Sequence, residues 1–315
     1  MTVFDYLEQF TKQYVQDANV SSIDDLSVIV KLNSMYRRIE LKQLDTIYKK
    51  AYAFPKIENI LIEYLEQLNS EYRDYFIIKT MDNTIVYEEN QFEKTAYFDY
   101  DEDNDKYIIY IPLNGTLRDI FTIIHELIHN KNFNAKKYSL TRTFFTEFLS
   151  LLAELLLEDY LKEKKIKDYK IHNNADLYYF QLISLEVDFN IKLIDSYLAS
   201  GYLDEKIIRQ ILYNYNQSEL NYIQLVIKKM LEKNYLTIDD EQIYIIGIFF
   251  ATYVYERIKN NPKNIQEFFE LNDVINDYSI EQVISYLDLE CEEGNLTDDS
   301  YKKLEMAYRK YLKNR

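Results

Sequence analysis

Two histidines and a glutamate stand together in the segment LNGTLRDIFTIIHELIHN, with a spacing that suits metal chemistry. On a helix, the four-residue separation of His125 and His129 places both imidazoles on one face, one turn apart. Each can then give one nitrogen to a Zn²⁺ ion at about 2.0 to 2.1 Å. The carboxylate of Glu126 lies beside them and can take a proton from a water molecule whose pKa the metal lowers to about 7. The H-E-x-x-H spacing therefore predicts a site for one catalytic zinc ion, with Glu126 as general base.

A catalytic zinc ion commonly has three protein ligands and an open position for water. The segment TRTFFTEFLSLLAELLLEDYL predicts a helix that is apolar around most of its circumference, with one polar stripe. The stripe consists of Thr143, Glu147, Ser150, Glu154 and Glu158. A helix this apolar must lie centrally in the fold, so its stripe would face the metal. We favour Glu147 as the third ligand and keep Glu154 as the alternative. Ser150 and Glu154 would otherwise orient the ligands.

The remaining histidine, His172, lies in the segment IHNNADLYY. These surroundings indicate a loop followed by the start of a helix. A single histidine in such a place is more often a surface or capping residue than a metal ligand. We therefore expect His172 to lie outside the metal site.

The elements around these residues predict a mainly α fold. Residues 1–72 have apolar positions at helical spacing and predict three or four helices. Residues 73–113 contain the runs YFIIK, TIVYEE, TAYFDY and KYIIYIPL, which are typical of a small antiparallel or mixed sheet. Helical spacing returns over residues 114–315. Because no linker or repeat interrupts the chain, we expect 1–315 to form a single catalytic unit, with the sheet directly before the active-site helix.

Composition and charge exclude several other classes of protein. A formal net charge of -16 disfavours binding to nucleic acid, because an acidic surface repels the phosphate backbone. No apolar stretch approaches the roughly 20 residues that span a bilayer, and the N-terminus lacks a basic segment followed by an apolar one. We expect no membrane partner and a cytoplasmic location. The single cysteine, Cys291, excludes an intramolecular disulfide.

Three segments resemble the thimet oligopeptidase and oligopeptidase F family of zinc metallopeptidases. The stretch KTAYFDYDEDNDKYIIYIPLNGTLRDIFTIIHELIH is similar to that family's substrate-binding edge strand, the following strand and the active-site helix. In YSLTRTFFTEFLSLLAELLLEDYL, the pattern F-x-E-x-x-S-x-x-x-E places the family's glutamate ligand at Glu147 and a second acidic residue at Glu154. The segment EQIYIIGIFFATYVYERI resembles the late helix whose tyrosine, here Tyr244, donates to the developing oxyanion. The resemblance implies a zincin-like fold, with an extended peptide along the strand near Ala96 and Tyr97.

The sequence also departs from the family pattern. Ile128 stands where members commonly have glycine, the further histidine that closely follows the motif is missing, and so are the histidine and extra tyrosine before the late tyrosine. The region before the motif is much shorter than in typical members, where it covers a deep channel and restricts the substrate to short peptides. These departures bear on substrate specificity more than on metal binding.

The sequence as a whole predicts a zinc-dependent metallopeptidase that hydrolyses internal peptide bonds of oligopeptides or extended polypeptide segments. Its partner would be a peptide substrate, and the sequence leaves the oligomeric state open. One alternative is a toxin-like zinc endopeptidase that acts on a single protein. Another is a catalytically silent binding protein that inherited the fold. The retained base Glu126 argues against this last alternative, because a silent protein has no chemical need for it.

Overall fold

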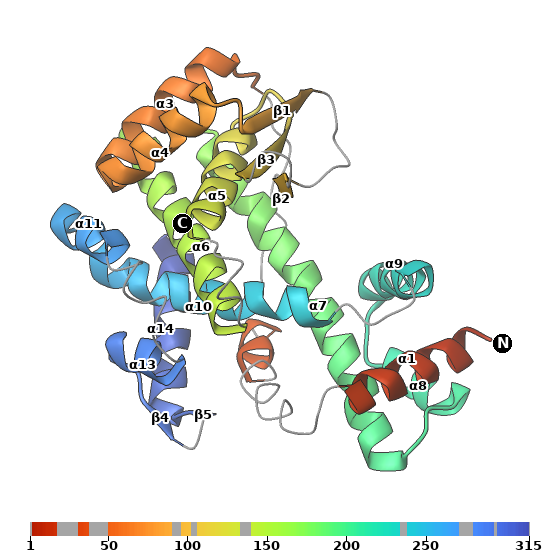
Figure 1. Ribbon diagram of the computed structural model, residues 1–315. Coiled ribbons are helices and arrows are strands. Elements are labelled where there is room, and N and C mark those ends of the chain that lie inside the picture. The colour runs from red at the N-terminus through yellow and green to blue at the C-terminus, as the bar shows by residue number, and fades with distance from the viewer. Residues whose placement is uncertain are drawn as a thin grey trace. The chain divides into compact units, whose positions relative to one another are not determined.

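The structure is a computed structural model that describes residues 2–17, 31–37, 50–89, 96–101, 106–132, 140–233, 238–270, 280–292 and 295–314 (Figure 1). The described chain is mostly helical with a small mixed sheet, which confirms the predicted fold class. The chain divides into two compact units. The first unit comprises Met1–Gln43, Leu177–Ile246 and Cys291–Tyr301, and the second comprises Leu44–Asp176, Gly247–Glu290 and Lys302–Arg315.

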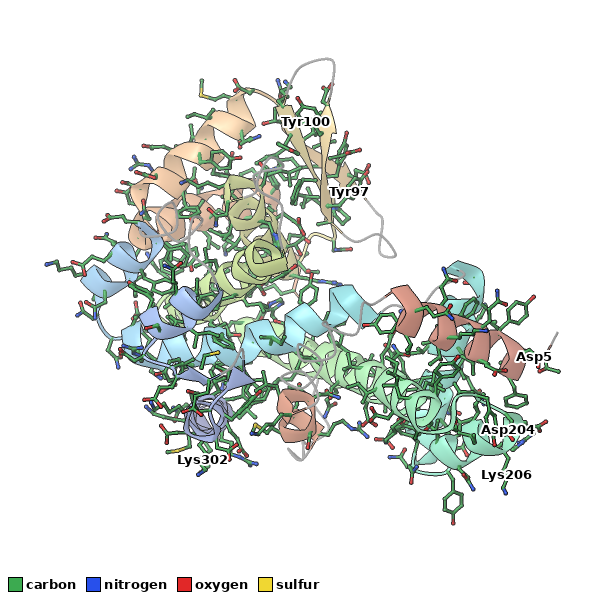
Figure 2. The ribbon with its side chains drawn as sticks, turned by 60° about the horizontal axis from the view of Figure 1, so that its bottom comes forward. Asp5, Tyr97, Tyr100, Asp204, Lys206 and Lys302 are labelled. Carbon is green, nitrogen blue, oxygen red and sulfur yellow. The ribbon has the colours of Figure 1, made fainter. Side chains whose placement is uncertain are left out.

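The sheet of the second unit has three strands in the order β1-β3-β2. The central strand β3 (Lys106–Leu113) pairs in parallel with β1 (Ile85–Glu89) and antiparallel with β2 (Tyr97–Asp101). Ile109 and Ile111 of β3 are buried, as expected for the middle strand of a half-covered sheet. Strand β2 is an edge strand of this sheet, and Figure 2 labels its Tyr97 and Tyr100.

The run YFIIK, predicted to be a strand, is helical. It lies within α4 (Ser70–Met81). The side chain of Asn69 accepts a hydrogen bond from the backbone N–H of Glu71 at 2.8 Å, and this N-cap starts the helix. Tyr72 and Phe76, four residues apart, are then buried on one face of the helix. The first strand of the sheet therefore begins at Ile85, and the predicted sheet boundary at residue 73 is wrong.

Two long helices form the centre of the second unit. Helix α5 (Arg118–Asn132) packs against β3 on one side and against α6 (Leu140–Glu163) on another. Helix α3 (Phe54–Leu68) packs against α4, α5, α6 and α11 (Pro262–Glu270). The buried apolar side chains of α5 are Ile120, Phe121, Ile123, Ile124, Leu127 and Ile128. Helix α5 is therefore held by apolar contacts around most of its circumference, which gives its polar side chains a fixed direction.

The first unit has its own apolar core. Its helices include α1 (Val3–Asp17), α8 (Glu205–Leu212), α9 (Gln217–Lys233) and the part of α7 (Tyr169–Ser200) that follows residue 176. The core contains Leu7, Phe10, Phe189, Leu193, Ile208, Ile223, Val226 and Met230. Such a cluster of mutually packed apolar side chains is what a separate compact unit requires.

The remaining elements are helical apart from one short hairpin. They are α10 (Ile238–Ile258), α13 (Ile280–Tyr286), α14 (Asp298–Asn314) and the antiparallel pair β4 (Cys291–Glu292) and β5 (Asn295–Leu296). Within the described ranges, no helix has the length and apolar character needed to cross a membrane.

Candidate metal centre

A buried aspartate fixes the point at which helix α5 begins. The carboxylate of Asp119 accepts hydrogen bonds from the backbone N–H groups of Asn114 at 3.0 Å, Gly115 at 2.8 Å and Thr116 at 3.2 Å. Gly115 has a φ of 67°, a conformation in which a side chain would be strained. This turn converts the end of β3 into the first turn of α5, so the sheet and the helix that carries the histidines are rigidly connected.

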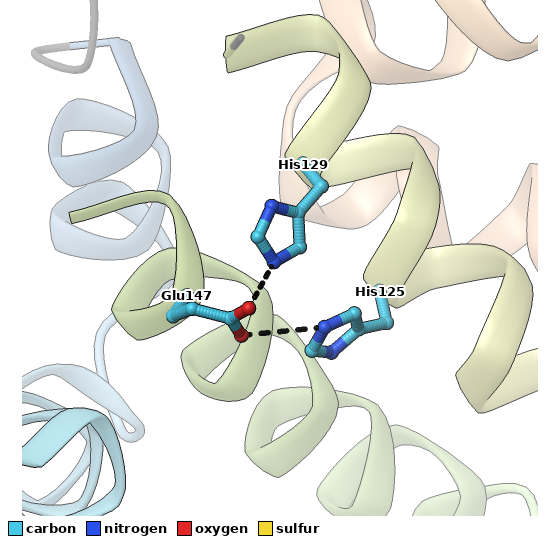
Figure 3. Close-up of side chains that lie close together, drawn as sticks. All are labelled: His125, His129 and Glu147. Carbon is cyan, nitrogen blue, oxygen red and sulfur yellow. Dashed lines mark ion pairs between the residues drawn. The ribbon is translucent and has the colours of Figure 1, made fainter. Parts of the chain in front are cut away.

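His125, His129 and Glu147 converge in the second unit (Figure 3). The Nε2 atom of His129 lies 2.9 Å from Glu147 Oε1, and the Nε2 atom of His125 lies 3.4 Å from Glu147 Oε2. The two imidazole centroids are 4.9 Å apart. All three side chains are largely buried, with exposed fractions of 11 to 13%. The structure thus brings together the three residues that the sequence predicted as metal ligands.

The chemistry and spacing of these three groups fit a zinc ion. Ligand atoms bound tetrahedrally at 2.0 to 2.1 Å lie about 3.3 Å from one another, close to the two nitrogen–oxygen separations. Glu147 Oε2 is buried and has no hydrogen bond within the described part of the chain. A buried carboxylate oxygen without a donor is costly unless a cation satisfies it. Two neutral imidazoles and one carboxylate form a common donor set for catalytic zinc.

Charge interactions in the cluster keep Glu147 ionised. Burial alone would raise the pKa of Glu147, but the imidazoles of His129 and His125 lower it strongly. Burial likewise would lower the pKa of His125, whereas the nearby carboxylates of Glu147 and Glu154 raise it well above its usual value. The two imidazoles thus favour the ionised form of Glu147, which is the form that binds a cation.

Helix α6 also provides two contacts behind His125. The Nδ1 atom of His125 lies 2.6 Å from Glu154 Oε1, and the hydroxyl of Ser150 donates to the backbone carbonyl of His125 at 3.1 Å. A ligating imidazole commonly donates its second N–H to a carboxylate, which fixes its tautomer and orientation. Glu147 and Glu154 therefore contact opposite nitrogens of the same ring, an arrangement compatible with one ligand and one orienting group.

The polar stripe predicted on α6 does not face the metal cluster along its whole length. Glu158 is buried and accepts from the hydroxyl of Tyr311 on α14, with oxygen–oxygen distances of 3.3 and 3.4 Å. The side chain of Thr143 lies outside the described residues. Among the stripe residues whose side chains the structure describes, Glu147, Ser150 and Glu154 therefore belong to the site and Glu158 does not.

Glu126 lies on α5 between the two histidines and is half-buried. Burial raises the pKa of Glu126 above the usual 4.5, the neighbouring imidazoles of His125 and His129 lower it, and the charges of Glu147 and Glu154 raise it further. A carboxylate is a better proton acceptor when its pKa is raised toward neutrality. The environment of Glu126 is thus compatible with the predicted general base.

His172 is the residue near the site that the sequence analysis missed. It lies in α7, is 5% exposed, and its ring stacks on that of Phe121 at 3.5 Å between centroids. Its Nε2 atom lies 2.9 Å from Asp176 Oδ2 and 3.6 Å from Glu154 Oε2. The expectation of a surface or capping position is therefore wrong. The available signal was the four-residue spacing of His172 and Asp176, which pairs them on one helix face.

The edge strand β2 lies beside the cluster. The ring centroid of Phe98 is 6.5 Å from that of His129, and α5 packs against β2. Ala96 directly precedes β2, and Tyr97 is 47% exposed while its ring stacks on that of Tyr110 at 4.8 Å. An edge strand in this place can pair with an extended peptide, so the substrate role predicted for Ala96 and Tyr97 is sterically possible and stays a prediction.

Tyr244 lies in the first unit, whereas the metal cluster lies in the second. Its ring makes an edge contact with that of Tyr179, with centroids 6.5 Å apart. Its predicted role at the oxyanion rests on the resemblance and stays a prediction.

Farther along α10, Gly247 lies against the cluster: a Cβ atom there would be 3.0 Å from Leu151 Cδ1 and 3.9 Å from Glu147 Cβ. The glycine therefore lets α10 approach α6 closely behind Glu147.

The comparisons with known proteins bear on the fold. No protein-family model matches the sequence, and no curated protein matches it. Among solved structures, the chain is similar to a candidate peptidase from Chlamydophila abortus, with a TM-score of 0.59 and 19% identity over 99% of this chain and 55% of the other. It is also similar to a candidate oligoendopeptidase F from Bacillus anthracis str. Ames, with a TM-score of 0.51 and 16% identity over 99% of this chain and 56% of the other.

Both similarities extend over nearly the whole chain at low sequence identity, so they establish the fold and leave the activity to be argued from the site. The chain spans about half the length of each of these two proteins. It shares its fold with these two proteins, one of them a candidate oligoendopeptidase F, in agreement with the resemblance seen in the sequence.

Proposed function

We propose that the protein is a zinc-dependent metallopeptidase that hydrolyses internal peptide bonds of oligopeptides or extended polypeptide segments. The observation that carries the proposal is the convergence of two imidazoles from α5 and one carboxylate from α6 at distances suited to a tetrahedral cation. The fold shared with two candidate peptidases supports the same reaction class.

In this proposal, His125, His129 and Glu147 hold one Zn²⁺ ion. When bound, zinc polarises the scissile carbonyl and lowers the pKa of the attacking water. Glu126 takes a proton from that water and delivers it to the nitrogen of the leaving amine, so that the proton is conserved as the peptide bond breaks. The extended substrate pairs with the edge of β2 near Ala96 and Tyr97, as peptides do when they add a strand to a sheet.

The resemblance supplies one further part of the proposal. Tyr244 would donate its hydroxyl to the negative charge that develops on the carbonyl oxygen. One such hydrogen bond, present only in the transition state, contributes about 2.7 to 4 kcal/mol to catalysis. Replacement of Tyr244 by Phe should then lower kcat with little change in zinc content.

The test combines metal analysis with peptide cleavage. The purified protein should contain close to one zinc per chain and cleave a quenched fluorescent peptide library. A chelator should abolish cleavage and added zinc should restore it. The Glu126→Gln variant should keep its zinc but lose nearly all turnover, because it lacks only the base. A protein that binds no zinc, or a remetallated Glu126→Gln variant that retains full activity, would refute the proposal.

The same assay distinguishes the substrate classes. Oligopeptides of graded length and intact proteins should be offered at equal concentrations of scissile bonds. Cleavage of many short peptides would identify an oligopeptidase, whereas cleavage of one protein alone would identify a dedicated endopeptidase.

A further inference from the structure

Behind the predicted zinc ligands, a chain of charged side chains continues from α5 through α6 to α7. His125 contacts Glu154 through Nδ1 at 2.6 Å. The other oxygen of Glu154 lies 3.6 Å from the Nε2 atom of His172, which in turn lies 2.9 Å from Asp176 Oδ2. All four residues belong to the second unit. The two oxygens of Glu154 thus face a predicted zinc ligand on one side and a second histidine on the other.

The inner members of this chain are shielded from solvent. The side chains of Glu154 and His172 are 13% and 6% exposed, and the ring of Phe121 stacks on the imidazole of His172 at 3.5 Å with an interplanar angle of 20°. Asp176, at the outer end, is 31% exposed. Phe121 lies one helical turn before His125, so α5 itself fixes both the metal-facing imidazole and the plane of the second one.

The imidazole of His172 lies between two carboxylates, and these favour its protonated form. Burial would lower its pKa, but Asp176 and Glu154 together raise it to about 9. A cation between two carboxylates offsets the cost of burying them. Within the described residues, His172 is the charged partner of the Glu154 oxygen that faces away from His125.

We propose that His172 and Asp176 are positioning residues for the zinc site, which act through Glu154 to hold the imidazole of His125 in the orientation that binds the metal. This inference rests on the proposed function and adds two residues to it. Asp176 fixes His172, His172 fixes Glu154, and Glu154 accepts the Nδ1–H of His125, which leaves Nε2 directed at the metal. Outer partners of metal ligands typically change metal affinity by about 10- to 100-fold.

The test measures zinc affinity by competition with a chelator at fixed pH, in the full-length protein. The His172→Gln and Asp176→Asn variants should bind zinc about 10- to 100-fold more weakly than the wild type. Because Asp176 is partly exposed, its variant provides the measurement if His172→Gln fails to fold. The matched control is Glu163→Gln, which removes one negative charge, as Asp176→Asn does, but from an exposed position of α6, and it should leave zinc affinity unchanged.

A double-variant cycle separates positioning from a general structural effect. If His172 acts through Glu154, the His172→Gln/Glu154→Gln protein should bind zinc no more weakly than Glu154→Gln alone. Additive losses would overturn the proposal, as would unchanged affinity in both His172→Gln and Asp176→Asn. A second equivalent of zinc in the wild type that disappears in His172→Gln would also overturn it, because the cluster would then be a metal site of its own.

These outcomes are distinct from failure of the proposed function. If the wild type binds no zinc, or if His125→Ala and His129→Ala bind zinc as tightly as the wild type, the proposed function fails. If the wild type binds one zinc ion through His125 and His129, but His172→Gln and Asp176→Asn bind zinc as tightly as the wild type, the proposed function stands and the positioning role fails.

Discussion

Glu147 and Glu154 lie on the same face of α6, yet they contact different nitrogen atoms of His125. Glu147 lies on the Nε2 side, where it also contacts His129, and Glu154 lies on the Nδ1 side. A metal can bind only one nitrogen of an imidazole while the other donates a hydrogen bond. Since Nε2 of both histidines faces Glu147, the geometry favours Glu147 over Glu154 as the third ligand.

This difference predicts an order of metal loss. Glu147→Gln should bind zinc at least about 100-fold more weakly than the wild type, because it removes a ligand charge and leaves the amide among buried groups. Glu154→Gln should weaken binding by about 10- to 100-fold, as expected for an outer partner. Chelator competition, checked by elemental analysis of dialysed protein, gives both values. If Glu154→Gln loses more zinc than Glu147→Gln, the two roles must be exchanged.

At the scale of residues, the sequence predicted the three side chains that converge at the candidate metal site and Glu154 beside them, but not the position of His172. The spacing of His125 and His129 and the polar stripe of α6 are local patterns. Such patterns can be recognised from the sequence alone. His172 was misjudged because its partners Glu154 and Phe121 come from other helices. No spacing within the segment IHNNADLYY indicates that a ring from α5 stacks on this histidine.

At the scale of elements, the turn before α5 is the connection on which the metal cluster depends. Asp119→Ala removes the acceptor for the N–H groups of Asn114, Gly115 and Thr116 and leaves these partly buried donors without it. We expect the free energy of unfolding to fall by about 1 to 3 kcal/mol, and zinc affinity to fall with it as α5 loosens. Urea denaturation of the metal-free protein measures the first effect.

A matched control for this variant is Asp82→Ala. Asp82 is an exposed aspartate at the end of α4, and surface changes of this kind usually alter stability by less than about 0.5 kcal/mol. Equal destabilisation by the two changes would mean that Asp119 has no special role in the turn.

A second prediction concerns the packing of α10 on α14. Glu256 of α10 contacts Lys259 at 2.7 Å and Lys310 of α14 at 2.6 Å. Burial would raise the pKa of Glu256, but the two lysines lower it below the usual 4.5. A carboxyl group with a lowered pKa in the folded state stabilises the fold above its unfolded-state pKa, and this stabilisation disappears as the pH falls through the folded-state pKa.

Glu256→Gln should therefore be less stable than the wild type at pH 7, and the difference in unfolding free energy should shrink as the pH falls below 4.5. Paired denaturation curves between pH 7 and pH 3 measure that difference directly. A difference that stays constant across this range would show that the charge of Glu256 does not contribute to stability.

The elements themselves were largely predictable where their pattern is long. Helices α5 and α6 follow from sustained apolar periodicity, and β3 follows from the aromatic and β-branched run YIIYI within its eight residues. The error at Tyr75–Lys79 has a physical reason. A five-residue run of this kind suits a strand as well as a helix, and the outcome is decided by the cap at Asn69 and by the burial of Tyr72 and Phe76.

At the scale of the whole molecule, the division into two compact units was not predicted from the sequence. Three of the five boundaries between the units fall within helices, in α7, α10 and α14. A fourth falls directly before β4, and the one that follows residue 43 lies outside the described residues. A helix that crosses from one unit to the other has the same composition as any other helix. No stretch rich in glycine, proline or serine therefore marks the boundary. The prediction of one catalytic unit over residues 1–315 stays a prediction.

The predicted ligands and the outer partners His172 and Asp176 all belong to the second unit, and this has a consequence that hydrogen exchange can measure. Zinc at about 100 times its dissociation constant stabilises the state that binds it by about 2.7 kcal/mol. Amide groups of α5 and α6 that exchange through opening of the second unit should therefore become roughly 100-fold slower in zinc.

In the first unit, amide groups of α8 and α9 should respond differently. They have their own apolar core, which includes Ile208, Ile223 and Met230, and they can open without disturbing a metal ligand. Their exchange should be nearly independent of zinc, and His129→Ala should remove the zinc effect from α5 and α6 without changing α8 and α9. If zinc slows all four helices equally in the wild type, the two units open as one cooperative body, and the metal then stabilises the entire chain rather than the unit that holds it.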